Sequence, residues 1–184
     1  MFDKKKIKNT WTLFLDRDGV INHEIHMNYV HKWEQFVFYD GTKEAIKVFS
    51  GIFNRIIVVT NQKGVGKGLT LLEDLEQIHA NMIDEISKAG GKIDEVFYCP
   101  DLDDNSPYRK PNPGMGLQAK AKYPEINFSE SLMVGNTLSD MEFGRNLGAF
   151  TVFIKTTHPE ITAEDHRVDI CFNSLSELAH WLSI

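Results

Sequence analysis

Short apolar runs alternate with amphipathic stretches along most of this chain. Six runs have the length of a strand and are almost continuously apolar, which is typical of strands buried on both faces of a parallel sheet; they are residues 12–16, 55–61, 95–99, 131–136, 150–154 and 169–172. Five stretches have helical patterns, some bounded by Gly or Pro; they are residues 42–52, 72–91, 113–123, 139–148 and 174–184. The alternation predicts an α/β fold, a doubly wound, mostly parallel sheet with helices on both faces.

The length of the chain and its even composition favour a single domain. The chain has 184 residues, without an internal repeat or a low-complexity linker. We therefore expect a single domain over residues 1–184, with the lysine-rich residues 1–10 flexible. No long insertion follows Ile21 or Gly68, so no large cap domain is expected over the ligand site.

Composition narrows the class of partner and the compartment. The 42% hydrophobic and 25% charged residues are ordinary for a folded protein, and the net charge of -6 argues against a nucleic-acid or anionic-membrane surface. The N-terminus has no apolar segment that would make it a secretion signal, and no window approaches the ~18 apolar residues of a membrane span. Two cysteines without CxxC spacing fit a reducing cytoplasm. We expect a cytoplasmic monomer or weak dimer that acts on a small molecule.

Polar side chains gather where three of the predicted strands end. Asp16 and Asp18 follow the first strand, Thr60 and Asn61 end the second, and Asn136 follows the fourth, with Asp140 a turn later. Any one of them could be a simple turn former. Together they indicate a ligand site, because ligands of doubly wound sheets bind at the carboxyl ends of the strands.

Asp16 and Asp18 repel each other and are costly to bury unless a cation compensates for their charge. A hard divalent ion such as Mg²⁺ prefers oxygen ligands of this kind. Asp16 is expected to bind it directly and Asp18 through its backbone carbonyl, which leaves the Asp18 side chain for proton transfer. The stretch lacks the register of a calcium-binding loop.

Two further segments have the composition of a phosphate site. Residues 58–68, VVTNQKGVGKG, fail the P-loop pattern at two positions, Asn61 and Gly68, but they supply a hydroxyl and glycine-rich backbone for a small anion-binding nest. Arg109 and Lys110 precede a predicted helix, where fixed cations suit a phosphate.

The ordered set of motifs resembles the haloacid dehalogenase (HAD) superfamily of phosphohydrolases. The motifs stand here as FLDRDGVIN, VVTNQKGVGKG, RKPNPGM and MVGNTLSDM, and the similarity spans residues 10–154. Within the superfamily, DRDGVIN, YVH, TNQ, RKPNPGM and SDM resemble the small capless enzymes that act on D,D-heptose 1,7-bisphosphate and on histidinol phosphate.

The resemblance implies a two-step phosphoryl transfer with Mg²⁺. Asp16 would be the nucleophile that forms an aspartyl phosphate, and Asp18 would be the general acid and then the general base. The remaining roles would be phosphoryl binding by Thr60 and Asn61, charge compensation by Lys110, and substrate or phosphate contacts by Gln62, Arg109 and Arg17. Mg²⁺ would lie among Asp16, the Asp18 carbonyl and position 136, with Asp140 binding through water or orienting Lys110.

The chain departs from the family at the metal site. The family usually carries an aspartate where this chain has Asn136, and an amide oxygen can bind Mg²⁺ but removes a negative charge. We therefore expect weaker metal binding. A phosphate-binding or scaffold domain that has lost activity is the alternative.

The second departure concerns zinc. Related phosphatases often carry a zinc loop of Cys and His before the RKP motif, but here only Cys99 remains, with Asp101, Ser106 and Tyr108 at the other positions. One thiolate does not make a structural zinc site, so no zinc is expected. His23, His26 and His31 are expected to be loop or partly packed histidines rather than metal ligands, in a loop that could line the substrate mouth.

Overall fold

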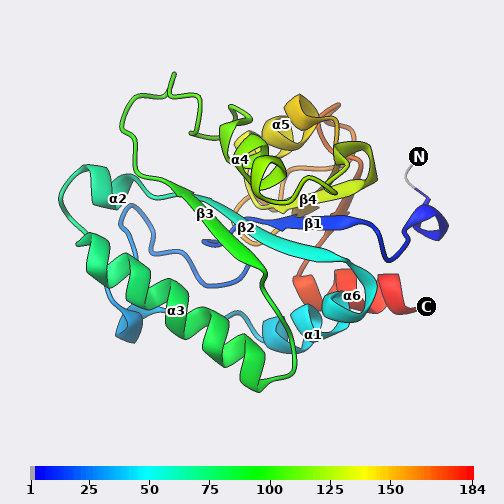
Figure 1. The fold of residues 1–184 in the computed structure, drawn as a ribbon, viewed down its shortest axis with the longest axis horizontal. Helices are drawn as coiled ribbons and strands as arrows, with labels where there is room; N and C mark the ends of the chain where they lie inside the picture. The colour runs from blue at the N-terminus through cyan, green and yellow to red at the C-terminus, as the bar shows by residue number, and fades with distance from the viewer. Residues whose placement is uncertain (1–2) are drawn as a thin grey trace.

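The computed structural model describes residues 3–184, and its centre is a parallel sheet of six strands (Figure 1). The strand order is β3-β2-β1-β4-β5-β6, and all pairs are parallel. The strands are β1 (Thr12–Leu15), β2 (Arg55–Asn61), β3 (Glu95–Cys99), β4 (Ser131–Gly135), β5 (Phe150–Ile154) and β6 (Ile170–Phe172). The predicted fold class and all six predicted strands are thus confirmed.

Helices cover both faces of the sheet (Figure 1). One face carries α1 (Thr42–Ile52), α3 (Leu72–Lys88) and α6 (Leu175–Ser183), and the other carries α4 (Gly114–Lys122) and α5 (Leu138–Leu147). The strands alternate their side chains between these layers: Leu13 packs into the core with α1, whereas Phe14 packs into the core with α4 and α5. Because helices cover both faces of the sheet, the strands are mostly apolar.

α3 ends at Lys88, just before the glycines at 90 and 91 that were predicted to close it, and Gly90 adopts a left-handed φ of 87° that stops the helix. One helical feature differs from the sequence-based expectation. A short helix, α2 (Lys63–Gly66), follows β2 within the glycine-rich segment, where no helix was predicted. It turns the chain directly at the carboxyl end of the sheet.

The connection between β1 and α1 contains no cap domain. Between Leu15 and Thr42 it holds a single 3₁₀ turn, η2 (Trp33–Gln35), besides isolated bridges and loops. Trp33 stacks on Phe36 at 5.1 Å between ring centroids, and Phe36 meets Phe38 at 5.0 Å. These aromatic contacts fix the connection against the core.

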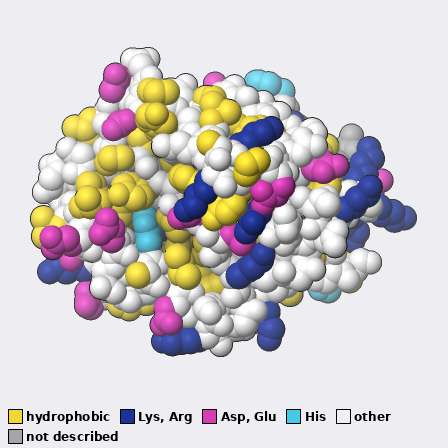
Figure 2. Space-filling view, viewed as in Figure 1, with side chains coloured by type: hydrophobic (Ala, Val, Ile, Leu, Met, Phe, Trp, Pro, Cys, Tyr) yellow, Lys and Arg dark blue, Asp and Glu magenta, His cyan; other side chains and the backbone are white. Residues whose placement is uncertain are grey.

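The N-terminal segment meets the C-terminal helix. Residues 4–6 form a 3₁₀ turn, η1 (Lys4–Lys6), and Lys4 Nζ donates to the Trp181 carbonyl at 2.5 Å. Figure 2 shows Lys and Arg side chains gathered at this end of the molecule. Residues 1 and 2 lie outside the described residues, and the flexibility expected for residues 1–10 stays a prediction. No helix within residues 3–184 combines the length and the apolar character that a bilayer crossing needs.

Candidate active site

The central strand β1 delivers Asp16 to the carboxyl edge of the sheet. Its backbone N–H donates to the Val134 carbonyl of β4 at 2.9 Å, which extends the strand pairing by one residue. The residue is 9% exposed, and its side chain accepts from the Arg17 N–H at 2.8 Å. Burial and then the nearby Asp140 carboxylate raise the pKa of Asp16 to about 7, against the opposing effect of Lys110.

Lys110 places its ammonium group between two carboxylates. Its Nζ lies 2.9 Å from Asp16 Oδ1 and 2.5 Å from Asp140 Oδ1, and the residue is buried. Burial disfavours its charge, but Asp140 and Asp16 outweigh burial and raise the pKa of Lys110. Asn61 fixes the backbone beneath it: Asn61 Nδ2 donates to the Lys110 carbonyl at 3.1 Å, and the Lys110 N–H donates to Asn61 Oδ1 at 3.0 Å.

Asp140 is held by the start of α5. Its Oδ2 accepts from the Thr137 N–H at 3.0 Å and from Thr137 Oγ1 at 2.7 Å, so it is part of a capping box. A Cβ atom on Gly135 would lie 2.2 Å from Asp140 Cβ, so a glycine is required for the approach. Both carboxylate oxygens of Asp140 are thus engaged, Oδ1 by Lys110 and Oδ2 by Thr137.

Asp18 lies in a dense set of donors. Its carboxylate accepts from Arg17 Nη2 at 2.9 Å, from Asn22 Nδ2 at 2.9 Å and from Gln62 Nε2 at 2.8 Å. Burial acts to raise the pKa of Asp18, but the Arg17 charge and the hydrogen bonds from Asn22, Arg17 and Gln62 together lower it below its usual value.

Arg17 and Gln62 both donate hydrogen bonds to Asp18. Arg17 is fully buried, with Nη1 3.0 Å from His79 Nε2 and its other nitrogens on Asp18. Gln62 is also buried, and its Nε2 is shared between Asp18 and the Thr60 hydroxyl at 2.9 Å. The side-chain donors of both residues are thus used inside the protein, and their expected contacts with substrate or phosphate stay a prediction.

Asn136 supplies an oxygen that lacks a protein partner. The residue is fully buried; its Nδ2 donates to Thr157 Oγ1 at 2.7 Å, and its Oδ1 accepts no hydrogen bond from residues 3–184. The amide lies against Gly19, where a Cβ atom would be 2.0 Å from Nδ2. A buried amide oxygen without a donor is costly, and a hard cation would satisfy it.

The oxygen atoms at this site are ligands of the kind that Mg²⁺ prefers. No group of three or more His, Cys, Asp or Glu side chains within residues 3–184 is arranged to hold a metal ion. A cation here would therefore be held by mixed oxygens, namely the Asp16 carboxylate, the unpartnered Asn136 amide oxygen and backbone carbonyl groups. Such a set suits Mg²⁺ better than zinc.

The loop before α4 is held by polar contacts among its own residues. Ser106 Oγ donates to the Asp101 carboxylate, and Arg109 Nε donates to Asp104 Oδ1 at 2.9 Å. Lys63 also pairs with Asp104, at 2.8 Å. Arg109 Nη1 is buried and has no hydrogen-bond partner among the described residues. Cys99, at the end of β3, is a free buried thiol.

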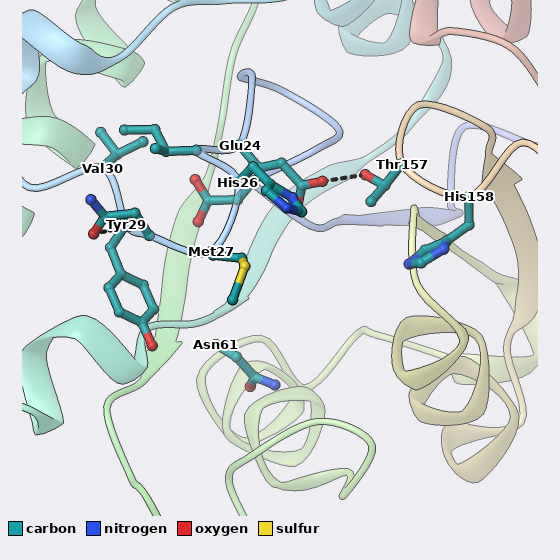
Figure 3. Close-up of a pocket in the computed structure, with 11 residues that line it drawn as sticks. Glu24, His26, Met27, Tyr29, Val30, Asn61, Thr157 and His158 are labelled. Atoms are coloured by element: carbon teal, nitrogen blue, oxygen red, sulfur yellow. Dashed lines mark hydrogen bonds between the residues drawn. The ribbon is translucent and has the colours of Figure 1, made fainter.

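A cavity of about 430 Å³ opens beside Asp18 and Asn61. Figure 3 shows its lining, which includes Glu24, His26, Met27, Tyr29, Thr157 and His158. Of the three loop histidines, His26 lines this cavity. His23 packs against Tyr39 with the ring centroids 3.8 Å apart and the planes tilted by 37°, and His31 Nδ1 contacts Thr70 Oγ1 at 2.8 Å.

Sequence reasoning missed four residues at this site: His79, Glu24, Thr157 and His158. His79 could have been noticed, because it lies at helical spacing from the buried Leu75 and Met82 on the apolar face of α3. Glu24 and Thr157 are 133 residues apart and belong to irregular segments, so no periodicity or motif relates them.

Known proteins share both the sequence and the arrangement. A family model described as HAD-hydrolase-like matches residues 107–178. The chain is 35% identical over 170 residues to the D-glycero-alpha-D-manno-heptose-1,7-bisphosphate 7-phosphatase of Mycobacterium tuberculosis, covering 92% of this chain and 90% of that protein. It is 34% identical over 173 residues to the D-glycero-beta-D-manno-heptose-1,7-bisphosphate 7-phosphatase of Pseudomonas putida, covering 92% and 98%.

A solved structure matches along almost the whole chain. The D,D-heptose 1,7-bisphosphate phosphatase from B. bronchiseptica, complexed with magnesium and phosphate, superposes with a TM-score of 0.84 at 26% identity, covering 94% of this chain and 97% of that one. By sequence and by fold, this chain belongs to the haloacid dehalogenase superfamily, among its phosphatases.

Proposed function

We propose that this phosphatase hydrolyses D-glycero-D-manno-heptose 1,7-bisphosphate through an aspartyl-phosphate intermediate, with Mg²⁺ as cofactor. The observation that carries the proposal is the placement of Asp16 between a buried ammonium group and an unpartnered amide oxygen. Lys110 Nζ lies 2.9 Å from Asp16, and Asn136 Oδ1 lacks a hydrogen bond. The names of the relatives support the substrate.

Asp16 acts as the nucleophile in the first step. A carboxylate oxygen attacks the phosphorus atom, and the bond from phosphorus to the sugar oxygen breaks. Lys110 offsets the negative charge on both the carboxylate and the phosphate. Asp140 keeps the ammonium group in place, since its other oxygen is fixed at the start of α5.

Asp18 moves the proton in both steps. It gives a proton to the leaving sugar oxygen and later takes one from the water that hydrolyses the aspartyl phosphate. The pKa of Asp18 is low in the free protein. A phosphate dianion brought beside it favours the protonated form, because like charges raise the pKa of a neighbouring carboxyl group.

Thr60 and Asn61 hold the transferring phosphoryl group. Thr60 Oγ1 accepts a hydrogen bond from Gln62 Nε2 at 2.9 Å, so its own O–H is available to donate to a phosphoryl oxygen. The Asn61 side chain is committed to the Lys110 backbone, so its contribution is the main-chain N–H. Arg109 contacts the remaining part of the substrate.

The Asp16 carboxylate, the Asp18 carbonyl and Asn136 Oδ1 are the groups that would hold Mg²⁺. When bound, the ion neutralises charge on the phosphate and on the nucleophile. The cavity of about 430 Å³ beside Asp18 has the size of a small-ligand site, and His26, Tyr29 and His158 offer polar atoms to sugar hydroxyl groups. We place the enzyme in a reducing cytoplasm, since Cys99 and Cys171 are both unpaired.

The test is phosphate release from a panel of substrates. The α and β anomers of heptose 1,7-bisphosphate, histidinol phosphate and p-nitrophenyl phosphate are compared with and without Mg²⁺, for the wild type, Asp16→Asn and the exposed-helix control Asp84→Asn. We expect Mg²⁺-dependent turnover of a heptose bisphosphate that Asp16→Asn lowers by about 10³-fold or more. Equal, negligible rates in the wild type and Asp16→Asn would refute the proposal. Preference for histidinol phosphate would change the substrate but not the chemistry.

A second candidate function rests on Asn136. An amide in place of a carboxylate removes one negative charge from the cation site, and a weakly charged site favours phosphate binding over turnover. The chain would then be a phosphate-binding or scaffold domain. Saturable binding of phosphate without turnover of any substrate in the panel would favour this function.

A further inference from the structure

Three side chains form a hydrogen-bonded chain across the loops that follow β1, β4 and β5. Asn136 Nδ2 donates to Thr157 Oγ1 at 2.7 Å, and Thr157 Oγ1 donates to Glu24 Oε1 at 2.7 Å (Figure 3 shows the second bond). We propose that Glu24 and Thr157 are positioning residues that fix which end of the Asn136 amide faces the cation site. This inference rests on the proposed function, since it concerns the Mg²⁺ of that same site.

The direction of each hydrogen bond follows from the chemistry of Glu24. An ionised carboxylate offers only acceptors, so the Thr157 hydroxyl must give its single proton to Glu24. The hydroxyl oxygen can then only accept from Asn136, and the group it accepts from must be the NH₂ end of the amide. Glu24 therefore selects the orientation of Asn136 through Thr157.

Packing alone does not make this selection. The oxygen and NH₂ ends of an amide have nearly the same size, so a site shaped around the side chain accepts both orientations. Asn136 is fully buried and lies against Gly19, which confines the amide to one place. In that confined position, hydrogen bonding alone determines whether the oxygen or the NH₂ group of the Asn136 amide faces away from Thr157.

The choice matters because only one end can bind a cation. With Nδ2 on Thr157, Oδ1 is the atom left without a hydrogen-bond partner and free to coordinate. The opposite orientation would present N–H donors to Mg²⁺, which needs oxygen ligands. An aspartate at position 136 would present an oxygen in either orientation. The Glu24–Thr157 pair is therefore required only because position 136 is an asparagine.

Thr156 holds the segment that carries Thr157 in position. Its Oγ1 donates to the Gly19 carbonyl at 2.5 Å, in the same loop that carries Asp16 and Asp18. The two consecutive threonines after β5 thus attach to both sides of the site, one to the β1 loop and one to Asn136. This arrangement sets Thr157 opposite the amide without help from a ligand.

The first experiment measures the orientation in the metal-free protein. In ¹⁵N-labelled protein, nuclear Overhauser contacts from the Asn136 NH₂ protons to the Thr157 methyl group are expected in the wild type. They should weaken in Glu24→Gln, because the glutamine NH₂ can donate to Thr157 and free its hydroxyl to donate to Asn136 Oδ1. Unchanged contacts in Glu24→Gln would overturn the proposal, whether or not the protein binds Mg²⁺.

The second experiment measures Mg²⁺ affinity by calorimetric titration. Glu24→Gln and Thr157→Val should weaken binding by about tenfold, as expected for residues that orient a metal ligand. The same changes in an Asn136→Asp background should have about no effect, since both ends of the introduced carboxylate are oxygens. Glu34→Gln, at an exposed carboxylate on η2, controls for the lost charge.

The outcomes separate this inference from the proposed function. An equal loss of Mg²⁺ affinity in the wild-type and Asn136→Asp backgrounds would show a general charge or folding effect. It would overturn the proposal that Glu24 and Thr157 orient Asn136. A wild type that binds no Mg²⁺ and turns over no substrate would refute the proposed function, while the metal-free orientation experiment would still decide the role of Glu24.

Discussion

Lys110 Nζ lies 2.9 Å from Asp16 Oδ1, although Lys110 precedes α4 and Asp16 follows β1. The same ammonium group contacts Asp140, so one cation serves two buried carboxylates. Their mutual repulsion is part of what raises the pKa of Asp16. The geometry therefore couples the stability of this edge of the sheet to its chemistry.

Replacing Lys110 with methionine should damage both properties. The loss of a charge-stabilising group is expected to lower kcat/KM by about 10²- to 10³-fold. The two carboxylates left buried without a cation should lower the free energy of unfolding by about 3 to 5 kcal/mol at neutral pH. Substrate kinetics and urea unfolding check the two effects, with Lys47→Met on the exposed side of α1 as the control. Unaltered turnover would remove Lys110 from the mechanism.

Replacing Asn136 with aspartate should tighten Mg²⁺ binding. The change adds a negative charge to a site whose amide oxygen lacks a hydrogen-bond partner, and we expect a gain of about tenfold in affinity and a higher kcat. Calorimetric titration and the Mg²⁺ dependence of turnover measure this, and Asn81→Asp on α3 serves as a charge-matched control. No gain in either quantity would mean that the amide is matched to its role.

The strands and the edge that bears the site could be predicted from sequence because each signal is local. A strand buried on both faces must be apolar along its whole length, and the polar residues that follow it must then lie at the carboxyl edge. Asp16, Asp18, Thr60 and Asn136 were located by this reasoning. Which of these polar residues become neighbours at the edge follows from the order of the strands, and no shared sequence motif is needed.

The partners within that edge could not be predicted in the same way. Arg17 was expected to face phosphate, but a fully buried guanidinium pairs with Asp18 and His79, and His79 comes from a helix 62 residues away. Whether a polar group faces the ligand or its neighbours depends on three-dimensional packing, which the spacing of residues along the chain does not encode. The Glu24–Thr157 contact is hidden for the same reason.

Replacing Gly135 with alanine should disturb the site by displacing Asp140. A Cβ atom there would lie 2.2 Å from Asp140 Cβ, so Gly135→Ala must push Asp140 away from Lys110. We expect a loss of about 1 to 3 kcal/mol in the free energy of unfolding, as for an overpacked core, together with reduced turnover.

The matched control for Gly135→Ala is Gly51→Ala. Gly51 lies in α1, and a Cβ atom there meets nothing within 4 Å. Alanine at that position should raise the free energy of unfolding by about 0.5 to 1 kcal/mol, because glycine costs helices backbone entropy. Denaturant unfolding of both variants checks the pair. Equal stability changes of one sign would contradict the steric account of Gly135.

His79 should make the stability of the protein fall in mild acid. The ring is buried, and Nε2 lies 3.0 Å from Arg17 Nη1, where it must accept and therefore be unprotonated. Burial, and then the Arg17 charge, lower the pKa of His79 from 6.5 to about 3, with Asp18 opposing. Between these two values the unfolded chain binds a proton that the folded protein does not, so stability present above about pH 6.5 is lost as the pH falls towards 3.

The expected size of the His79 effect is about 2 kcal/mol between pH 7.5 and pH 5, since each pH unit below the unfolded pKa contributes about 1.4 kcal/mol. His79→Gln keeps a hydrogen-bond acceptor for Arg17 without a group that titrates in this range. Urea unfolding at the two pH values should therefore show a smaller acid loss in His79→Gln than in the wild type. The His180→Gln variant should follow the wild type, because the His180 side chain is exposed to water in the folded protein as it is in the unfolded chain. Parallel losses in all three proteins would show that His79 is protonated in the folded state, and that Arg17 is held towards Asp18 by other contacts.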